Sequence, residues 1–241
     1  MISKVKAVGF DESSLYESAL SLATELNIKV DNNIFPRLSY TDLKLVLLVE
    51  NFSPLYVDFI SQSIKQRVSS QKKPDLVRAV KPTKGMKIID ATAGWGRDAA
   101  VLASFGADIL LLERDPAMAK LLADGIKRIP VTSILQGKLS LLETDAINYL
   151  DSLLREDYPD IIYIDPMHPE RQKSALVKKD LQALQQIIGA DVDAEKLIKL
   201  AITRTKNRVV VKWPQRLVPL IKPNYSLNGK TIRFDVYTKQ L

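Results

Sequence analysis

The chain has 241 residues, of which 46% are hydrophobic and 26% charged, and it carries a formal net charge of +7. This composition is typical of a globular protein of one large domain, or of one domain with a small companion, and the absence of cysteine excludes a disulfide framework and a thiolate metal site. No apolar stretch is long enough to cross a membrane and the first residues lack the apolar run of a signal peptide, so we expect a cytoplasmic protein without a membrane partner. The positive charge favours a polyanionic partner, nucleic acid first, and a charge that only keeps the protein soluble is the alternative.

Residues 1–60 are predicted to form a separate, small α/β extension. Its expected elements are a strand at Val5–Gly9, a helix at Asp11–Leu26, a strand within Asp42–Glu50 and a returning strand at Leu55–Phe59. No residue here carries recognisable chemistry. Residues 1–60 can therefore be a lid, an RNA-docking platform or a plain structural extension, and the sequence does not decide between these roles.

Residues 61–85 are a polar, basic connection with one short helix expected at Asp75–Val80 after Pro74. A solvated linker and a surface that contacts phosphates are both open. On the second interpretation Lys72 and Lys73 are candidate RNA-binding residues.

A strand, a loop of small residues and a helix start are expected over Met86–Asp98, followed by a helix to Phe105. Nucleotide-like cofactors use this arrangement. Gly94 and Gly96 let the backbone approach a ligand closely and adopt positive φ at little cost. An ordinary strand-to-helix turn is the alternative.

The acid at the end of this strand favours one cofactor over another. A carboxylate at Asp90 would repel a pyrophosphate, whereas it suits the sulfonium and ammonium groups of S-adenosylmethionine (SAM). The small residues at every second place after Asp90 also match the first motif of class I methyltransferases. A nicotinamide cofactor is the distant alternative, because its fingerprint tolerates Ala99 in place of the third glycine but its pyrophosphate would meet the Asp90 carboxylate.

From Met86 onward strands and helices alternate, which predicts a mostly parallel sheet with right-handed crossovers. A strand is expected at Asp108–Leu112, and Glu113 after it is placed to accept hydrogen bonds from ribose hydroxyls. The alternative is that Glu113 is an acid on the surface at the end of a strand. After a helix at Ala117–Lys127, the next strand is expected at Leu139–Leu142.

Asp145 follows that strand and has two possible roles. It is the candidate acceptor for the adenine amino group of the cofactor, or the N-cap of a helix at Ile147–Leu154, and one residue can do both.

The fourth strand, Asp160–Ile164, is apolar and opens into Asp165-Pro166-Met167-His168-Pro169. Amino-group methyltransferases carry a related Asp/Asn-Pro-Pro-aromatic loop at this place. An exocyclic amine is a poor nucleophile because its lone pair is delocalised into the ring. An acceptor such as Asp165, with a carbonyl in the loop stiffened by Pro166, helps to localise that pair and can take the proton. For His168, stacking on the target base is favoured over acid–base work, and a metal role is not expected.

The remaining chain fits the same sheet. A helix is expected at Ser174–Ile188, another from Asp193 to about Thr205, a fifth strand at Val209–Lys212, and a C-terminal hairpin that turns at Asn228-Gly229. The basic residues before and in the first of these helices are candidate phosphate contacts, with a solvated face as the alternative. They are Arg171, Lys173, Lys178 and Lys179.

Several of these motifs together resemble one family. The motifs are Asp90-Ala-Thr-Ala-Gly-Trp-Gly-Arg-Asp98, Leu112-Glu-Arg114, Asp165-Pro-Met-His-Pro169, Gln172-Lys-Ser-Ala-Leu-Val-Lys-Lys179, Arg208-Val-Val-Val-Lys-Trp-Pro214 and Arg233-Phe-Asp-Val-Tyr237. Over roughly residues 55–238 the chain is similar to the ribosomal RNA small subunit methyltransferase J family. Those enzymes use SAM to methylate N2 of one guanine in 16S ribosomal RNA.

The resemblance implies a set of site residues. Arg97, Asp98, Glu113, Arg114 and Asp165 fall at the family's SAM-site positions, and the pair Asp145-Ala146 replaces two small polar residues there. The sequence departs from the family at His168, usually Phe, at Trp213, usually Arg, and at Ser69–Pro74, usually rich in Gly and Arg.

The sequence therefore predicts a class I SAM-dependent methyltransferase domain at residues 86–241, with a Rossmann-like sheet that ends in an antiparallel hairpin. The expected partner is 16S ribosomal RNA or the 30S subunit, and no metal is expected. A SAM-binding RNA chaperone or assembly factor with little turnover, and a methyltransferase for an exocyclic amine in another nucleic acid, are the alternatives.

Overall fold

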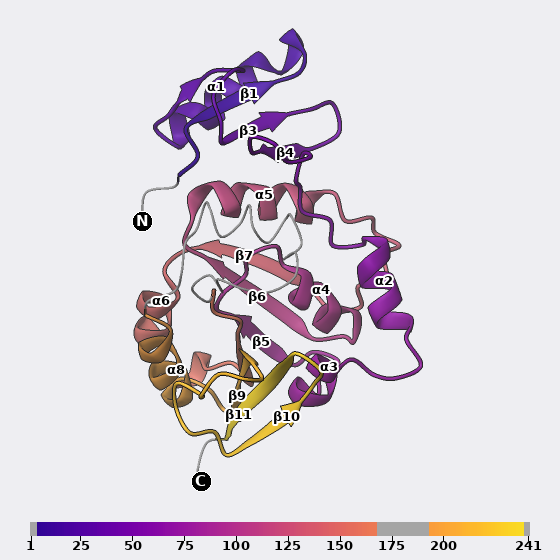
Figure 1. The fold of residues 1–241 in the computed structure, drawn as a ribbon, viewed down its shortest axis with the longest axis vertical. Helices are drawn as coiled ribbons and strands as arrows, with labels where there is room; N and C mark the ends of the chain where they lie inside the picture. Colours follow the sequence, from indigo (N-terminus) through magenta and orange to yellow (C-terminus); the bar gives the residue numbers. More distant parts are fainter. Residues whose placement is uncertain (1–3, 168–192, 239–241) are drawn as a thin grey trace. The chain divides into compact units, whose positions relative to one another are not determined.

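The computed structural model describes residues 4–167 and 193–238 (Figure 1). The described chain forms two compact units. Residues 4–58 and 115–128 make up the small unit, and residues 59–114, 129–167 and 193–238 the large unit. The helix predicted at Ser174–Ile188 lies outside the described residues.

The small unit is built on a four-stranded sheet with the strand order β2-β1-β3-β4. β1 is parallel to both β2 and β3, and β4 is antiparallel to β3. The strands are β1 (Ala7–Phe10), β2 (Lys29–Val30), β3 (Arg37–Tyr40) and β4 (Leu45–Leu48). The helices of the unit are η1 (Ser13–Leu15), α1 (Tyr16–Glu25) and α5 (Pro116–Lys127).

The returning strand predicted at Leu55–Phe59 is wrong. Only Leu55 pairs with the sheet, through a single bridge to Leu47 in which each residue donates its backbone N–H to the other. Val57 and Phe59 are buried, but their backbone joins no ladder. The apolar pattern of this segment therefore reflects side-chain packing, which a strand pattern and an irregular buried segment share.

The large unit contains a seven-stranded sheet with the order β10-β11-β9-β8-β5-β6-β7. The strands from β5 to β9 run parallel to one another, while β11 is antiparallel to both β9 and β10. This confirms the expected mostly parallel sheet with an antiparallel C-terminal pair. The strands are β5 (Lys87–Asp90), β6 (Asp108–Glu113), β7 (Leu139–Glu143), β8 (Ile161–Ile164), β9 (Arg208–Pro214), β10 (Tyr225–Asn228) and β11 (Ile232–Thr238).

Helices cover the sheet of the large unit. They are α2 (Gln62–Ser69), α3 (Asp75–Val80), α4 (Arg97–Ser104), α6 (Ala146–Ser152), η2 (Arg155–Asp157) and α8 (Ala194–Thr203). The basic connection thus contains a helix, α2, that the sequence did not predict. Its N-terminal amide at Ile64 donates to the Ser61 hydroxyl, and the Ile64 side chain is buried.

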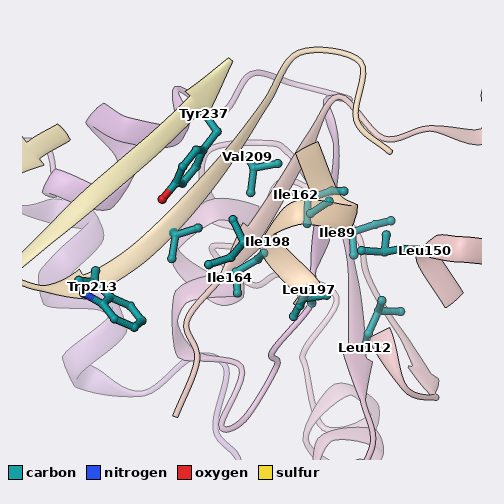
Figure 2. Packing of buried hydrophobic residues seen from close by; sticks show 13 residues of the cluster. Ile89, Leu112, Leu150, Ile162, Ile164, Leu197, Ile198, Val209, Trp213 and Tyr237 are labelled. Carbon is teal, nitrogen blue, oxygen red and sulfur yellow. The ribbon is translucent and has the colours of Figure 1, made fainter. Parts of the chain in front are cut away.

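One continuous core lies between the sheet and the helices α6 and α8 (Figure 2). Alternate residues of β5, β8 and β9, such as Ile89, Ile162 and Val209, meet Leu150 of α6 and Ile198 of α8. Side chains alternate along a strand, so the intervening residues point to the other face of the sheet. That second face carries α4 and, in β8 and β9, the polar side chains described below.

The C-terminal hairpin forms as predicted, but it turns at a different place. Gly229 donates its N–H to the carbonyl of Ile232, so the chain reverses over Lys230 and Thr231. A Cβ on Gly229 would stand 2.8 Å from that carbonyl oxygen and 3.2 Å from Asp75. Gly229 therefore lies directly before the reversal, between the end of β10 and Lys230, at a place where a side chain would clash.

Candidate active site

The acids predicted from the ends of the strands gather at one edge of the large sheet. Asp90 ends β5, Glu113 ends β6 and Asp165 directly follows β8. These strands are parallel neighbours, so their carboxyl ends meet at the same edge, which is where ligands bind in sheets of this kind.

The glycine loop between β5 and α4 adopts the backbone that the sequence predicts. Gly94 has a φ of 50° and Gly96, at the N-cap of α4, a φ of 67°. The N–H of Gly94 donates to Oε2 of Glu113 at 3.2 Å, and Glu113 is buried. The Glu113 carboxylate thus fixes the glycine loop to β6. It also lies where the sequence analysis expects an acceptor for the ribose hydroxyls of the cofactor.

A charged network connects α2, α4, β8 and β9. The Asp98 carboxylate accepts hydrogen bonds from Arg67 Nη2 at 2.9 Å, from the Tyr163 hydroxyl at 2.7 Å and from Lys212 Nζ at 2.9 Å. The same Lys212 ammonium donates to Oδ2 of Asp165 at 2.7 Å. Lys212 therefore joins the helix that follows the cofactor loop to the loop that carries the predicted catalytic acid.

The pKa values in the network reflect these contacts. Burial alone would raise the pKa of Asp98, but the charges of Lys212 and Arg67 and the Tyr163 hydrogen bond hold it well below its usual value. Burial alone would lower the pKa of Lys212, but the Asp165 and Asp98 carboxylates raise it well above its usual value. Both partners of the ion pair between Lys212 and Asp98 are therefore charged near neutral pH.

Thr92 links the two loops a second time. Its hydroxyl accepts the backbone N–H of Asp165 at 2.6 Å, and its own N–H donates to Oδ1 of Asp90 at 3.2 Å. The backbone of the Asp165 loop is thereby held against the cofactor loop, independently of Lys212.

The pKa of Asp90 lies well above the ordinary value of an aspartate. Burial raises the pKa of Asp90 to about 8, and the charges of Asp98 and Asp165 act in the same direction, against the Thr92 hydrogen bond. Near neutral pH most of this side chain is therefore a neutral acid. The carboxylate that the sequence analysis expects forms as the pH rises past this value.

Arg114 and Asp145 lie together at the ends of β6 and β7. Arg114 Nη1 donates to Asp193 at 2.9 Å and stands 4.0 Å from Oδ2 of Asp145. Oδ1 of Asp145 accepts the N–H of Asn148 at 3.0 Å, so the predicted N-cap role of Asp145 is confirmed. Ala146 is the first residue of α6.

The other predicted residues fall into two groups. Arg97 is exposed at the start of α4, and Lys72 and Lys73 are exposed between α2 and α3. The predicted His168 and the basic group of Arg171, Lys173, Lys178 and Lys179 lie outside the described residues.

Across residues 4–167 and 193–238, no group of three or more His, Cys, Asp or Glu side chains is arranged to hold a metal ion. Within that same part of the chain, no helix is both long and apolar enough to cross a membrane.

Sequence reasoning missed Lys212, Arg67, Tyr163 and Thr92. Lys212 carried a usable signal, since a lysine directly after Val209–Val211, in a buried strand, needs a partner for its charge. Arg67 carried none, because its partner is 31 positions away in the sequence.

These residues fit a cofactor that combines a positive charge with a ribose. The glycine loop lets the backbone come close to a ligand, Glu113 is a buried acceptor beside it, and Asp90 is a buried acid at the end of the adjoining strand β5. Residues 21–239 match a family model described as "Putative SAM-dependent methyltransferase". The crystal structure of a SAM-dependent methyltransferase from Neisseria gonorrhoeae is similar over 97% of this chain and 96% of its own, with a TM-score of 0.72 and 27% identity. Fold, site and comparisons together define a SAM-dependent methyltransferase, which confirms the predicted fold class and cofactor.

Full-length relatives identify the particular family. The chain is 54% identical over 239 residues to a ribosomal RNA small subunit methyltransferase J from Legionella pneumophila (strain Corby), covering 99% of this chain and 98% of the relative. It is 39% identical over 251 residues to the protein of the same name from Thioalkalivibrio sulfidiphilus, covering 96% of each. The chain belongs to the ribosomal RNA small subunit methyltransferase J family.

Proposed function

We propose that this protein transfers the methyl group of SAM to the exocyclic N2 of a guanine in 16S ribosomal RNA. The names of its full-length relatives support small-subunit ribosomal RNA as the substrate. The observation that carries the chemistry is the Asp165 carboxylate, held by Lys212 at 2.7 Å and tied through its backbone to Thr92 of the cofactor loop. The reaction requires neither a metal ion nor a membrane.

The cofactor would lie over the glycine loop. Gly94 and Gly96 admit it, Glu113 accepts from its ribose hydroxyls, and Asp90 faces its positive charge. Asp98 acts by fixing Lys212. The neighbouring positions Arg97, Arg114, Asp145 and Ala146 complete the cofactor site, with Asp145 contacting the adenine amino group through the carboxylate that also caps α6.

SAM supplies the methyl group as an electrophile on its sulfonium. Asp165 accepts an N–H hydrogen bond from the guanine amine, which localises the nitrogen lone pair for attack. The proton that the amine gives up on accepting the methyl group would go to Asp165, and a carbonyl of the loop that Pro166 stiffens would accept a hydrogen bond from the other N–H. A carboxylate has about four acceptor positions, so the bond from Lys212 leaves acceptor capacity for the amine. The fixed carboxylate also orients the amine, which supplies part of the rate.

The remaining parts of the proposal concern RNA and the extension. His168 would stack on the guanine after the base leaves its stack. Phosphates would be contacted by Lys72, Lys73 and the basic residues Arg171, Lys173, Lys178 and Lys179. Residues 1–60 would act as an extension of a cytoplasmic methyltransferase that acts on free 16S ribosomal RNA or on the 30S subunit.

A labelling experiment tests the function. The protein is incubated with methyl-labelled SAM and, separately, with undermethylated 30S subunits, unmethylated 16S ribosomal RNA and DNA, and the labelled nucleoside is identified after digestion. We expect N2-methylguanosine from ribosomal RNA. Label in another nucleoside or in DNA would overturn the substrate assignment. Measurable SAM binding without label in any substrate would favour an assembly factor.

The first prediction concerns Asp165. We expect Asp165→Ala to bind SAM as the wild type does, because the cofactor loop keeps its own bonds, and to lose methyl transfer by about a hundredfold or more, as removal of a catalytic proton acceptor does. Calorimetry with SAM and single-turnover methylation measure the two effects. Unchanged turnover would contradict the catalytic role.

A further inference from the structure

The segment that joins β9 to β10, residues 215–224 (the β9–β10 loop), exposes large apolar side chains. Val218 is 84% exposed, and Leu217 and Leu220 are also exposed. Single exposed apolar residues are common on protein surfaces, but a group within four consecutive positions marks a contact surface.

Buried side chains bind the backbone carbonyls of this loop, so its apolar side chains remain exposed to solvent. The guanidinium of Arg233 in β11 is buried, and its Nη1 donates to the carbonyls of Pro214 at 3.1 Å, Gln215 at 2.9 Å and Leu217 at 2.8 Å. Asp235, also buried, accepts from Nε of Arg233 at 2.7 Å.

Two aromatic side chains hold the rest of the loop. The Trp213 indole donates to the carbonyl of Val218 at 3.0 Å, and the Tyr237 hydroxyl donates to that of Ile221 at 2.8 Å. Side-chain donors on its carbonyls therefore fix the loop along its length, and the exposure of Val218 is a property of an ordered surface.

The loop begins at the edge of the sheet where the active site lies. β9 runs parallel to β8, and the loop leaves β9 two residues after Lys212, the residue that binds Asp165 at 2.7 Å. The turn between β10 and β11 lies at the same edge, because Ile232 pairs with Pro214 and Gln215 donates its N–H to the Thr231 carbonyl at 3.1 Å.

The charge of this surface is entirely positive. From Pro214 to Ile232 the sequence contains no acid, and its three charged residues, Arg216, Lys222 and Lys230, are all exposed. The neighbouring Asp75 is paired with Arg78 at 2.8 Å. Exposed aliphatic side chains between cations fit a partner that offers both unstacked bases and phosphates.

We propose that the β9–β10 loop is an RNA-binding element of the active site. Leu217, Val218 and Leu220 pack against the bases that flank the target nucleotide and fill the space that it leaves when it turns out of its stack. Arg216, Lys222 and Lys230 contact the adjoining phosphates. The inference rests on the proposed function, since it takes ribosomal RNA as the substrate.

Apolar substitutions test the contact with bases. The double variant Leu217→Ser/Val218→Ser is compared with Val131→Ser. Val131 is a fully exposed valine of the same unit, in the segment between α5 and β7, and is not part of the β9–β10 loop. With 16S ribosomal RNA transcribed in vitro as the probe, we expect the double variant to weaken RNA binding by about tenfold, as loss of a contact with a base does. SAM affinity and melting temperature should stay at the wild-type values, and Val131→Ser should change none of the three.

Charge substitutions test the contact with phosphates. We expect Arg216→Gln/Lys222→Gln to lower the slope of log K against log salt concentration by about one for each cation removed. An unchanged slope would overturn this part of the proposal.

The outcomes separate this inference from the proposed function. Because RNA binding is measured without turnover, failure of the protein to methylate RNA would count against the function alone. Wild-type RNA affinity of the Leu217→Ser/Val218→Ser variant would overturn the inference, as would equal weakening by Val131→Ser. A change of oligomeric state in sedimentation, with RNA affinity unchanged, would assign the surface to contact between copies of the chain and would also overturn it.

Discussion

Lys212 is the residue through which the two halves of the active site depend on each other. Its ammonium donates to Asp98 at 2.9 Å and to Asp165 at 2.7 Å, from the strand next to the one that carries Asp165. Without Lys212, the buried Asp98 carboxylate and the half-buried Asp165 carboxylate would face each other, which is unfavourable for both. Lys212 is thus a positioning residue for Asp165 and a stabilising partner for Asp98.

Substitution of Lys212 separates these two roles. We expect Lys212→Met to destabilise the fold by about 3 kcal/mol, because it leaves Asp98 without its main cation, and to lower kcat by at least tenfold. In the double variant Lys212→Met/Asp98→Asn the buried charge is gone, so stability should largely return while kcat stays low. Denaturant unfolding and steady-state methylation measure the two effects. Recovery of kcat together with stability would show that Lys212 acts only by neutralising Asp98.

The raised pKa of Asp90 makes stability depend on pH. Its carboxyl has a pKa of about 8 in the folded protein, against an ordinary value of 3.8 for an aspartate, so it binds its proton more tightly when the chain is folded. The contribution of this group to stability is fully present below about pH 4 and is lost as the pH rises toward 8.

We therefore expect Asp90→Asn to be more stable than the wild type at pH 9, on the order of several kcal/mol, and similar to it near pH 4. The same variant should bind SAM more weakly, because it cannot ionise toward a cation. Urea unfolding without cofactor at several pH values tests the first effect, with Asp42→Asn, an exposed acid, as the control. Parallel curves for Asp90→Asn and the wild type would contradict the assignment.

At the scale of elements, helices and strands were predicted best where the local hydrophobic pattern matches the side that the element buries in the fold. The strands β5 to β9 are short apolar runs between clear helices, and α3 was predicted with its bounds unchanged at Asp75–Val80. β2 and β3 were not predicted, because β2 has only two residues and β3 has only four, directly after Pro36, which is too short a run for its alternation to stand out. α2 was missed because its polar composition left only Ile64 to mark the buried side.

The active site shows the same difference between what local sequence pattern predicts and what depends on tertiary packing. Each acid at the end of a strand was predictable, because parallel strands bring their carboxyl ends to one edge whatever their exact register. The partners of Asp98, which lies in α4, were not predictable in this way. Arg67, Tyr163 and Lys212 meet Asp98 only because α2, β8 and β9 converge on α4, and that convergence depends on the packing of the whole unit.

At the scale of the molecule, the small compact unit draws its residues from two separate parts of the sequence. The helix α5, which follows Arg114 in the sequence, belongs to the same compact unit as the N-terminal sheet. Within that unit Lys120 of α5 pairs with Glu25 of α1, and the guanidinium of Arg128 donates to the carbonyl of Val57. A helix in the middle of the cofactor-binding half of the sequence therefore takes part of its support from residues before position 60.

Removal of residues 1–58 tests this dependence. We expect the shortened protein to keep the glycine loop and the Asp98 network, whose residues all lie beyond position 58, but to lose the contacts of α5 with α1 and β4. Amide hydrogen exchange over residues 118–127 should then become faster by about tenfold or more, while exchange in β5 and β8 stays close to the wild-type rate. Lys120→Ala in the full-length protein is the milder comparison, because an exposed ion pair contributes about 0.5 kcal/mol and should change exchange little. If α5 exchanged at the wild-type rate after the deletion, the N-terminal sheet would not support this helix, and a boundary near residue 60 would be sufficient to separate an independent methyltransferase domain.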